Sequence, residues 1–262
     1  MSASALQVAR TGLEAQDTRM RVIANNLANA NTTAFKSERA NFATLAYQDA
    51  RVAGQQSSTE SAYATGLNLG TGVSIQSTTR TMSQGTLNST GNTYDMAIQG
   101  DGYFQVAMPG GQMAYTRAGN FTLSATGQIV TSQGYVVQPP ITIPPGSASI
   151  TIGTDGTVSA IPSGSSAPTT LGQIQLASFT NSSALQAASD NFLMETAASG
   201  PVQMGAAGQN GTGSLSQGML ETSNVNITNE LVDMIECQRA YEINSKMISS
   251  VDDMLKNANQ TL

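Results

Sequence analysis

The sequence predicts an α+β fold in which paired N- and C-terminal α-helices, coiled-coil-like in their spacing, flank an inserted all-β domain. Apolar residues recur every seven positions near the N-terminus, the same spacing returns near the C-terminus, and short strand patterns separated by glycine turns fill the middle. The 262 residues, 39% of them apolar, are enough to bury a sizeable core.

The N-terminal helix is predicted over residues 1–30. Its narrow apolar stripe has a period of seven and consists of Leu6, Leu13, Met20 and Leu27. Ala9, Ile23 and Ala30 each follow three positions after a member of that stripe, which is the spacing of a helix that packs along a partner helix.

A second helix is predicted over residues 225–262. Its period-seven stripe consists of Ile227, Met234, Tyr241, Ile248 and Leu255, and it is flanked by Leu231, Cys237 and Val251. Asn226 or Thr228 is expected to cap this helix, and Glu230 places an acid in its first turn.

The two ends carry opposite net charges. Residues 1–51 have a net charge of +2, and the chain from residue 219 on has a net charge of −4. Opposite charge on two apolar stripes favours pairing of the two helices. The alternative, which periodicity alone does not exclude, is that each amphipathic helix rests on the chain's own β domain.

The β-rich middle is predicted over residues 76–211. Asp155-Gly156 lies between the strand patterns 149–153 and 157–161, and Asp-Gly suits a type I′ hairpin turn. A second hairpin is predicted from residues 120–123 and 128–131, and Pro139–Pro145 interrupts the strands. Residues 31–75 and 212–224 are expected to connect the helices to this domain. Within them, residues 54–72 are rich in Gly, Ser, Thr and Gln, as in a flexible linker.

Composition excludes several classes of function. The chain has no histidine and one cysteine, which removes most nucleophilic triads, zinc sites and internal disulfides. A net charge of −6 argues against nucleic-acid binding, and no apolar run reaches the ~18 residues of a membrane span. The N-terminus lacks the pattern of a cleaved signal peptide. We therefore expect no catalytic, cofactor or metal site and no direct membrane insertion.

Four local patterns have a simple structural interpretation as well as a functional one. Residues 99–104 contain two glycines, but they lack the spacing of a nucleotide-binding loop and are expected to form a tight turn. Asp95, Asp101 and Asp155 are the candidate carboxylates of a glycosidase, although Asp95 and Asp101 are more simply explained by turns or by pairing with the two central arginines, Arg80 and Arg117. Cys237 is expected to be a small buried residue. Residues 252–253 are both aspartates and are expected to face solvent or a basic partner, not calcium.

The most informative run extends from Asn25 to Lys36 and reads NNLANANTTAFK. Asn and Thr compete for backbone hydrogen bonds, so this run is expected to end the first helix in a turn bonded by side chains. As a pattern it resembles the shared N-terminal motif of flagellar rod, hook and hook-associated proteins. That family usually has glycine where this chain has Ala34, so we expect the backbone to be slightly rebuilt there.

The resemblance extends over nearly the whole chain. Its central block is carried by residues 84–87, 90–92, 95–98, 102–104, 115–117 and 119–121, and its C-terminal block by residues 217–225 and 238–242. Within the family, the length and the Pro139–Pro145 segment are most similar to distal rod proteins, since hook proteins are considerably longer. A proximal rod protein and a hook-like axial subunit remain alternatives.

The resemblance implies a structural subunit that polymerises into a rigid hollow helical tube, transmits torque and passes exported subunits. Its implied partners are further copies of itself, proximal rod and hook subunits, the surrounding ring proteins and the flagellar export apparatus. Its implied location is the basal body, from periplasm to outer membrane, after export without a cleaved signal peptide. A secreted adhesin and a cell-wall-acting enzyme are the alternatives from other classes.

The residues expected at the assembly interface come from both helices and from the segment between the first helix and the β domain. They are Leu6, Leu13, Met20, Asn25, Asn26, Leu27, Asn29, Phe35, Tyr63, Leu67, Leu69, Ile227, Leu231, Met234, Tyr241, Ile248 and Leu255.

Overall fold

The computed structural model describes residues 2–52, 54, 56–58, 61–147, 149–163 and 167–260. The chain forms two compact units. Unit 1 combines residues 1–28, 38–80 and 226–262, and unit 2 combines residues 29–37 and 81–225. Each unit is therefore built from segments that lie far apart in the sequence.

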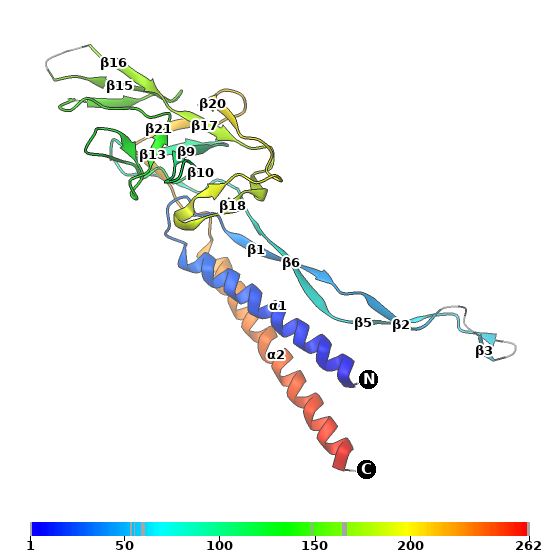
Figure 1. Ribbon diagram of the computed structural model, residues 1–262. Coiled ribbons are helices and arrows are strands. Elements are labelled where there is room, and N and C mark those ends of the chain that lie inside the picture. Colours follow the sequence, from blue (N-terminus) through cyan, green and yellow to red (C-terminus); the bar gives the residue numbers. More distant parts are fainter. Residues whose placement is uncertain are drawn as a thin grey trace. The chain divides into compact units, whose positions relative to one another are not determined.

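Two long helices dominate unit 1 and run antiparallel, side by side (Figure 1). They are α1 (Ser2–Ala28) and α2 (Ile227–Gln260). The Oδ1 atom of Asn226 accepts hydrogen bonds from the backbone N–H groups of Thr228 (3.1 Å) and Asn229 (3.2 Å), so Asn226 is the N-cap of α2. The predicted α+β class, with terminal helices flanking a β-rich domain, is confirmed.

The remainder of unit 1 is a β ribbon, seen as the long pair of strands in Figure 1. Its antiparallel pairs are β1 (Glu38–Thr44) with β6 (Val73–Arg80), β2 (Tyr47–Arg51) with β5 (Leu67–Gly70), and β3 (Gln56–Ser58) with β4 (Ser61–Ala62). The described part of the linker-like segment thus consists largely of paired strands.

The ribbon is attached to α1 at Gly72. The backbone N–H of Val73 donates to Oγ1 of Thr11 over 3.3 Å, and a Cβ atom on Gly72 would lie 2.2 Å from that oxygen. Gly72 also has a φ of +120°, which disfavours side chains. Only glycine lets the ribbon approach the helix so closely.

Unit 2 contains a nine-stranded sheet whose main path has the order β11-β12-β13-β9-β10-β19-β18, with β17 pairing with both β9 and β20. Its strands are β9 (Tyr103–Ala107), β10 (Met113–Thr116), β11 (Thr122–Leu123), β12 (Ile129–Val130), β13 (Val136–Gln138), β17 (Gln175–Ser178), β18 (Gln186–Ala187), β19 (Leu193–Met194) and β20 (Gln203–Ala206). Short 3-10 helices at Ser182–Ala184 and Ser189–Asn191 connect some of these strands.

Smaller sheets complete unit 2. One joins β14 (Ser149–Ile152), β15 (Thr157–Ile161) and β16 (Thr169–Gln173); two others pair β8 (Met96–Gln99) with β21 (Ser214–Gln217) and β7 (Leu87–Ser89) with β22 (Met219–Glu221). Fourteen buried side chains form the main core, among them Met96, Phe104, Phe121 and Leu176. Phe104 and Phe121 meet edge to face with ring centroids 5.0 Å apart.

Both predicted hairpins are present, but one turn type was wrong. Strands β14 and β15 pair antiparallel across Gly153–Gly156, as do β11 and β12 across residues 124–128. A type I′ turn needs positive φ at both central residues, and among Gly153, Asp155 and Gly156 only Gly156 has it (φ 86°). The N–H of Gly153 donates to the carbonyl of Thr157 and that of Gly156 donates to the carbonyl of Gly153, so a three-residue loop, residues 154–156, replaces the two-residue turn.

Candidate assembly interface

The helices α1 and α2 approach each other closely within unit 1. Ala9, Ala15 and Ile23 are buried on α1, and Cys237 and Val251 are buried on α2. A Cβ atom on Gly12 would lie 3.3 Å from Nδ2 of Asn244, which shows how closely the two helices approach.

Polar contacts fix the register of the pair. Arg19 forms a 2.8 Å ion pair with Asp233. The Sγ atom of Cys237 donates to the carbonyl of Gln16 over 3.1 Å, and burial raises the pKa of this thiol. Cys237 is thus the small buried residue that the sequence indicated.

Asn26 joins three elements of unit 1. Its Nδ2 donates to Oε1 of Glu230 on α2 (3.0 Å) and to the carbonyl of Glu38 on β1 (2.8 Å), while its Oδ1 accepts from the N–H of Glu38 (2.9 Å). Burial raises the pKa of Glu230 and outweighs the hydrogen bond from Asn26. Asn26 is therefore a structural junction, with its side chain 2% exposed.

The predicted interface residues on the helices fall into different environments. Half-buried ones are Leu6, Leu13, Met20, Leu27, Met234 and Ile248, and exposed ones are Asn25, Ile227, Leu231 and Tyr241. Asn29 and Phe35, in unit 2, are half-buried, and the side chain of Leu255 lies outside the described residues. The large apolar side chains of these helices are thus only partly buried within the single chain.

An apolar ridge on α2 is left uncovered within unit 1. It follows the i, i+4 row of the helix and consists of Ile227, Leu231, Ile235, Ile243 and Met247, which are 44–63% exposed. Arg239 occupies the remaining position of that row. Rows of this kind are the ones that helices pack into each other's grooves. The heptad pattern missed Ile235, Ile243 and Met247, which an i, i+4 search of the sequence would have found.

The β ribbon also exposes apolar and aromatic side chains. These include the predicted interface residues Tyr63, Leu67 and Leu69 together with Phe42, Tyr47, Val52 and Ile75. Two contacts stiffen the ribbon: the Arg80–Glu38 ion pair of 2.8 Å and the guanidinium of Arg51, 4.1 Å from the ring centroid of Tyr63.

A buried ion cluster in unit 2 joins three segments that lie far apart in the sequence. Oε1 of Glu221 accepts from Nζ of Lys36 (2.6 Å) and from the N–H of Gly85 (2.9 Å), and Oε2 accepts from Nε of Arg117 (2.9 Å). The side chains of Lys36, Arg117 and Glu221 are 7%, 5% and 0% exposed. One carboxylate thus faces two cations in the interior.

Carbonyl oxygens stabilise the additional positive charge. Lys36 also donates to the carbonyl of Ser83 (2.7 Å), and Arg117 donates to that of Gly100 (2.7 Å). Burial lowers the pKa of Lys36 and outweighs the opposite influence of Glu221. Burial by itself raises the pKa of Glu221, but Arg117 and the hydrogen bonds from Lys36 and Gly85 hold it below its ordinary value of 4.5.

The turn after α1 forms as the Asn- and Thr-rich run predicted. Thr32 donates to Asn29 through its backbone N–H and, over 3.1 Å, through Oγ1 to Oδ1. The expected rebuilding at Ala34 is wrong, because Ala34 keeps a left-handed backbone with φ 55°. Its N–H donates to the carbonyl of Glu221 over 2.8 Å, and this contact holds the conformation.

Two of the candidate carboxylates, Asp95 and Asp155, accept hydrogen bonds within turns. Asp95 accepts from Thr90 and Asn92 in a turn, and Asp155 accepts from the N–H and Oγ1 of Thr157. Residues 100–102 form the predicted turn between β8 and β9, with Gly100 at φ 109°. The central arginines are paired with Glu38 and Glu221 instead of Asp95 or Asp101.

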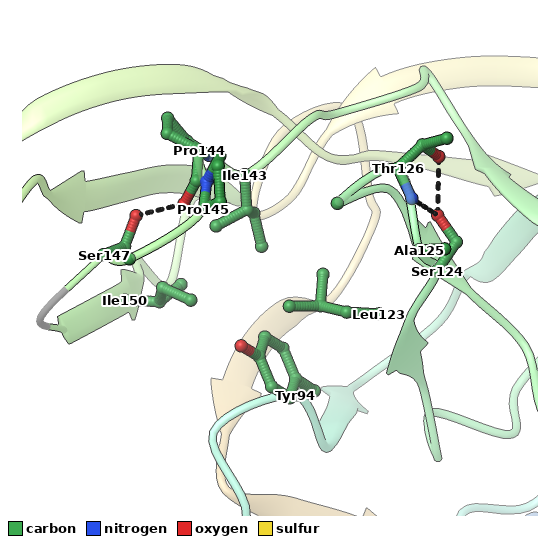
Figure 2. Close-up of a pocket in the computed structure, with 12 residues that line it drawn as sticks. Tyr94, Leu123, Ser124, Ala125, Thr126, Ile143, Pro144, Pro145, Ser147 and Ile150 are labelled. Atoms are coloured by element: carbon green, nitrogen blue, oxygen red, sulfur yellow. Dashed lines mark hydrogen bonds between the residues drawn. The ribbon is translucent and has the colours of Figure 1, made fainter.

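Figure 2 shows a hollow of about 320 Å³ in unit 2. Tyr94, Leu123 and Ile150 line its apolar side, and the loops 124–127 and 143–147 close it. The lining side chains that the structure describes are apolar or carry a hydroxyl group. Such a surface offers packing and no acid–base pair.

Within the described ranges, no helix is long and apolar enough to cross a membrane. In the same residues no group of three or more Cys, Asp or Glu side chains is arranged to hold a metal ion.

Three family models match this chain. Residues 6–36 match the model described as flagella basal body rod protein, residues 97–160 match the flagellar hook protein FlgE/F/G D1 domain, and residues 216–261 match the C-terminal model of the flagellar basal body rod FlgEFG proteins. These ranges contain Lys36, Arg117 and Glu221, so the three members of the ion cluster come from three separate matched regions.

Comparison of the whole chain with known proteins agrees with these family models. The chain is 49% identical to a flagellar basal-body rod protein FlgG of Buchnera aphidicola, over 97% of this chain and 98% of the relative. It is 47% identical to that of Caulobacter vibrioides, over 98% of both chains, and 34% identical to the flagellar basal-body rod protein FlgF of the same organism, over 92% of this chain and 90% of the relative. The chain belongs to the flagellar rod and hook family, FlgE/F/G, and is a structural basal-body rod protein, not an enzyme.

Proposed function

We propose that this rod protein is a distal rod subunit that polymerises into a rigid hollow helical tube, transmits torque and passes exported subunits. Higher identity to the FlgG relatives than to the FlgF relative supports the distal position over the proximal one. Its partners would be further copies of itself, proximal rod and hook subunits, the surrounding rings and the export apparatus. It would reach the basal body between periplasm and outer membrane without a cleaved signal peptide.

In this proposal the terminal helices, residues 1–30 and 225–262, form the core of the tube. Residues 31–75 and 212–224 connect them to an outer β domain, residues 76–211. The single observation that carries the proposal is the apolar ridge on α2, because its members are about half exposed in the isolated chain. Fully burying such a side chain is worth about 1.5–3 kcal/mol, and because these five are already about half buried, covering each contributes roughly half of that to assembly.

The test uses ridge residues because their exposure lets unit 1 fold without them. Ile235→Asp and Ile243→Asp place a charge where a neighbouring helix would remove water, so we expect neither variant to polymerise. Gln133→Asp, which adds a charge at an exposed position of unit 2, is the control and should polymerise normally. Electron microscopy shows polymers and circular dichroism monitors helix content. Normal tubes from both ridge variants would refute the proposal.

The β ribbon would make the tube rigid. An isolated two-stranded ribbon is only marginally stable in water, and this one exposes Tyr47, Val52, Leu67 and Leu69. Neighbouring subunits that cover these side chains would fix the register of the polymer. Deleting residues 53–64 should therefore give curved or compressible tubes, measured by electron microscopy. Straight tubes of unchanged stiffness would contradict this role while leaving polymerisation itself unaffected.

A further inference from the structure

The segment 29–37 of unit 2 depends on residues from the far end of the chain. The N–H of Ala34 donates to the carbonyl of Glu221, the N–H of Ser37 donates to Oδ1 of Asn224 (2.7 Å), and the N–H of Asn224 donates to the carbonyl of Phe35 (3.3 Å). These partners lie more than 180 positions later in the sequence. The local sequence therefore supplies only part of what orders this segment.

Charge makes the dependence stronger. Lys36 and Arg117 are both buried, and Glu221 is the one acidic residue that contacts either of them among the described ion pairs. Until residues 219–222 are in place, burying Lys36 beside Arg117 would bring two like charges together in a poorly hydrated site. In that state the segment around Lys36 is more stable when exposed to water than when packed against the rest of unit 2.

Asn191 provides a second contact that holds the segment 29–37 in place. Its Nδ2 donates to the carbonyl of Thr33 over 3.1 Å, and its backbone adopts a φ of 61° next to Asp190 at 58°. Two successive left-handed residues other than glycine are costly unless their surroundings hold them. Asn191 also comes late in the chain, so each of these contacts to residues 33–37 awaits chain that lies beyond position 190.

We infer that Glu221 is a closing residue: residues 33–37 become ordered only when β22 (Met219–Glu221) has paired, so a chain presented from its N-terminus stays open in this segment until its C-terminal part arrives. The inference concerns the single chain and goes beyond polymerisation. It assigns the contacts among Lys36, Gly85, Arg117 and Glu221 to one conformational role.

The first experiment compares full-length Glu221→Gln with the natural chain by limited trypsin digestion. Gln keeps the shape of the side chain and removes its charge. We expect cleavage after Lys36 to become faster by on the order of a hundredfold, and to remain faster than hydrogen exchange in β9 and β17, which requires unit 2 to open as a whole. Glu195→Gln, at an exposed position, is the control and should not change cleavage at Lys36. Unchanged protection of Lys36 in Glu221→Gln would overturn the inference.

The second experiment needs no variant, so it tests the closing role of Glu221 even if Glu221→Gln fails to fold. The natural chain is refolded from denaturant, and pulsed hydrogen exchange measures when each amide becomes protected. The amides of residues 34–37 should gain protection together with or after those of residues 219–222. Protection of residues 34–37 before residues 219–222 would refute the closing role.

Discussion

Nζ of Lys36 donates to Oε1 of Glu221 over 2.6 Å, although 185 positions separate the two residues. Arg117 approaches the other carboxylate oxygen at 2.9 Å, so the cluster contains two cations and one anion. This imbalance makes the three side chains unequal in their contributions to stability. The carboxylate is the member on which the other two depend.

Glu221→Gln should therefore destabilise unit 2 by about 3–5 kcal/mol, because it leaves both buried cations unpaired. Lys36→Met, which keeps the length of the side chain but removes one cation, should cost less than about 1.5 kcal/mol, since the pair of Arg117 and Glu221 remains. Urea unfolding followed by hydrogen exchange in β9 measures both values. A larger loss in Lys36→Met than in Glu221→Gln would contradict the imbalance.

The stability of unit 2 should fall in acid. The pKa of Glu221 is held below its ordinary value of 4.5 in the folded chain, so its contribution is present above pH 4.5 and is lost as the pH falls through the folded-state pKa. The midpoint of urea unfolding, measured from pH 6 downward, reports this loss. In Glu221→Gln the corresponding part of the pH dependence should disappear, and an identical acid profile for both proteins would exclude Glu221 as its source.

Position 34 should tolerate glycine but not valine. Ala34→Gly relieves about 1–2 kcal/mol of left-handed strain, but it loses a buried methyl group and adds freedom to the unfolded chain, so the net change should stay under about 1 kcal/mol. Ala34→Val places a branched side chain at φ 55° in a site that is 2% exposed, and should cost more than about 2 kcal/mol. Thermal unfolding compares the three proteins. Equal stability of the valine variant would show that the backbone rearranges freely.

Asn26→Leu should destabilise unit 1 by about 3 kcal/mol or more. It removes hydrogen-bond partners from the N–H and the carbonyl of Glu38 and from the side chain of Glu230, each worth about 1–3 kcal/mol when left buried and unpaired. Gln238→Leu, exposed on α2, is the control and should stay within about 0.5 kcal/mol. Helix unfolding by circular dichroism measures the difference. A stable Asn26→Leu variant would mean that water replaces the lost contacts.

Local patterns in the sequence determined the type and position of the main elements. The period-seven stripes gave both helices to within a few residues, because burial of one helix face must repeat with the helical period. Asn226 was one of two predicted caps, and the Asn- and Thr-rich run gave the turn after Ala28, because these side chains bond to nearby backbone. The family motif gave the structural role.

Tertiary structure decided which residues meet. Periodicity could not show that Ala9, Ile23 and Cys237 are buried while Ile235 and Ile243 stay exposed, since several faces of each helix are apolar. Composition suggested a linker where a ribbon forms, because strand pairing depends on a partner about 20 residues away and not on local preference. Lys36, Arg117 and Glu221 were each visible in the sequence as charged residues. Their meeting in one buried cluster required the whole fold, since the contacts join positions 104 and 185 residues apart and only burial makes them strong.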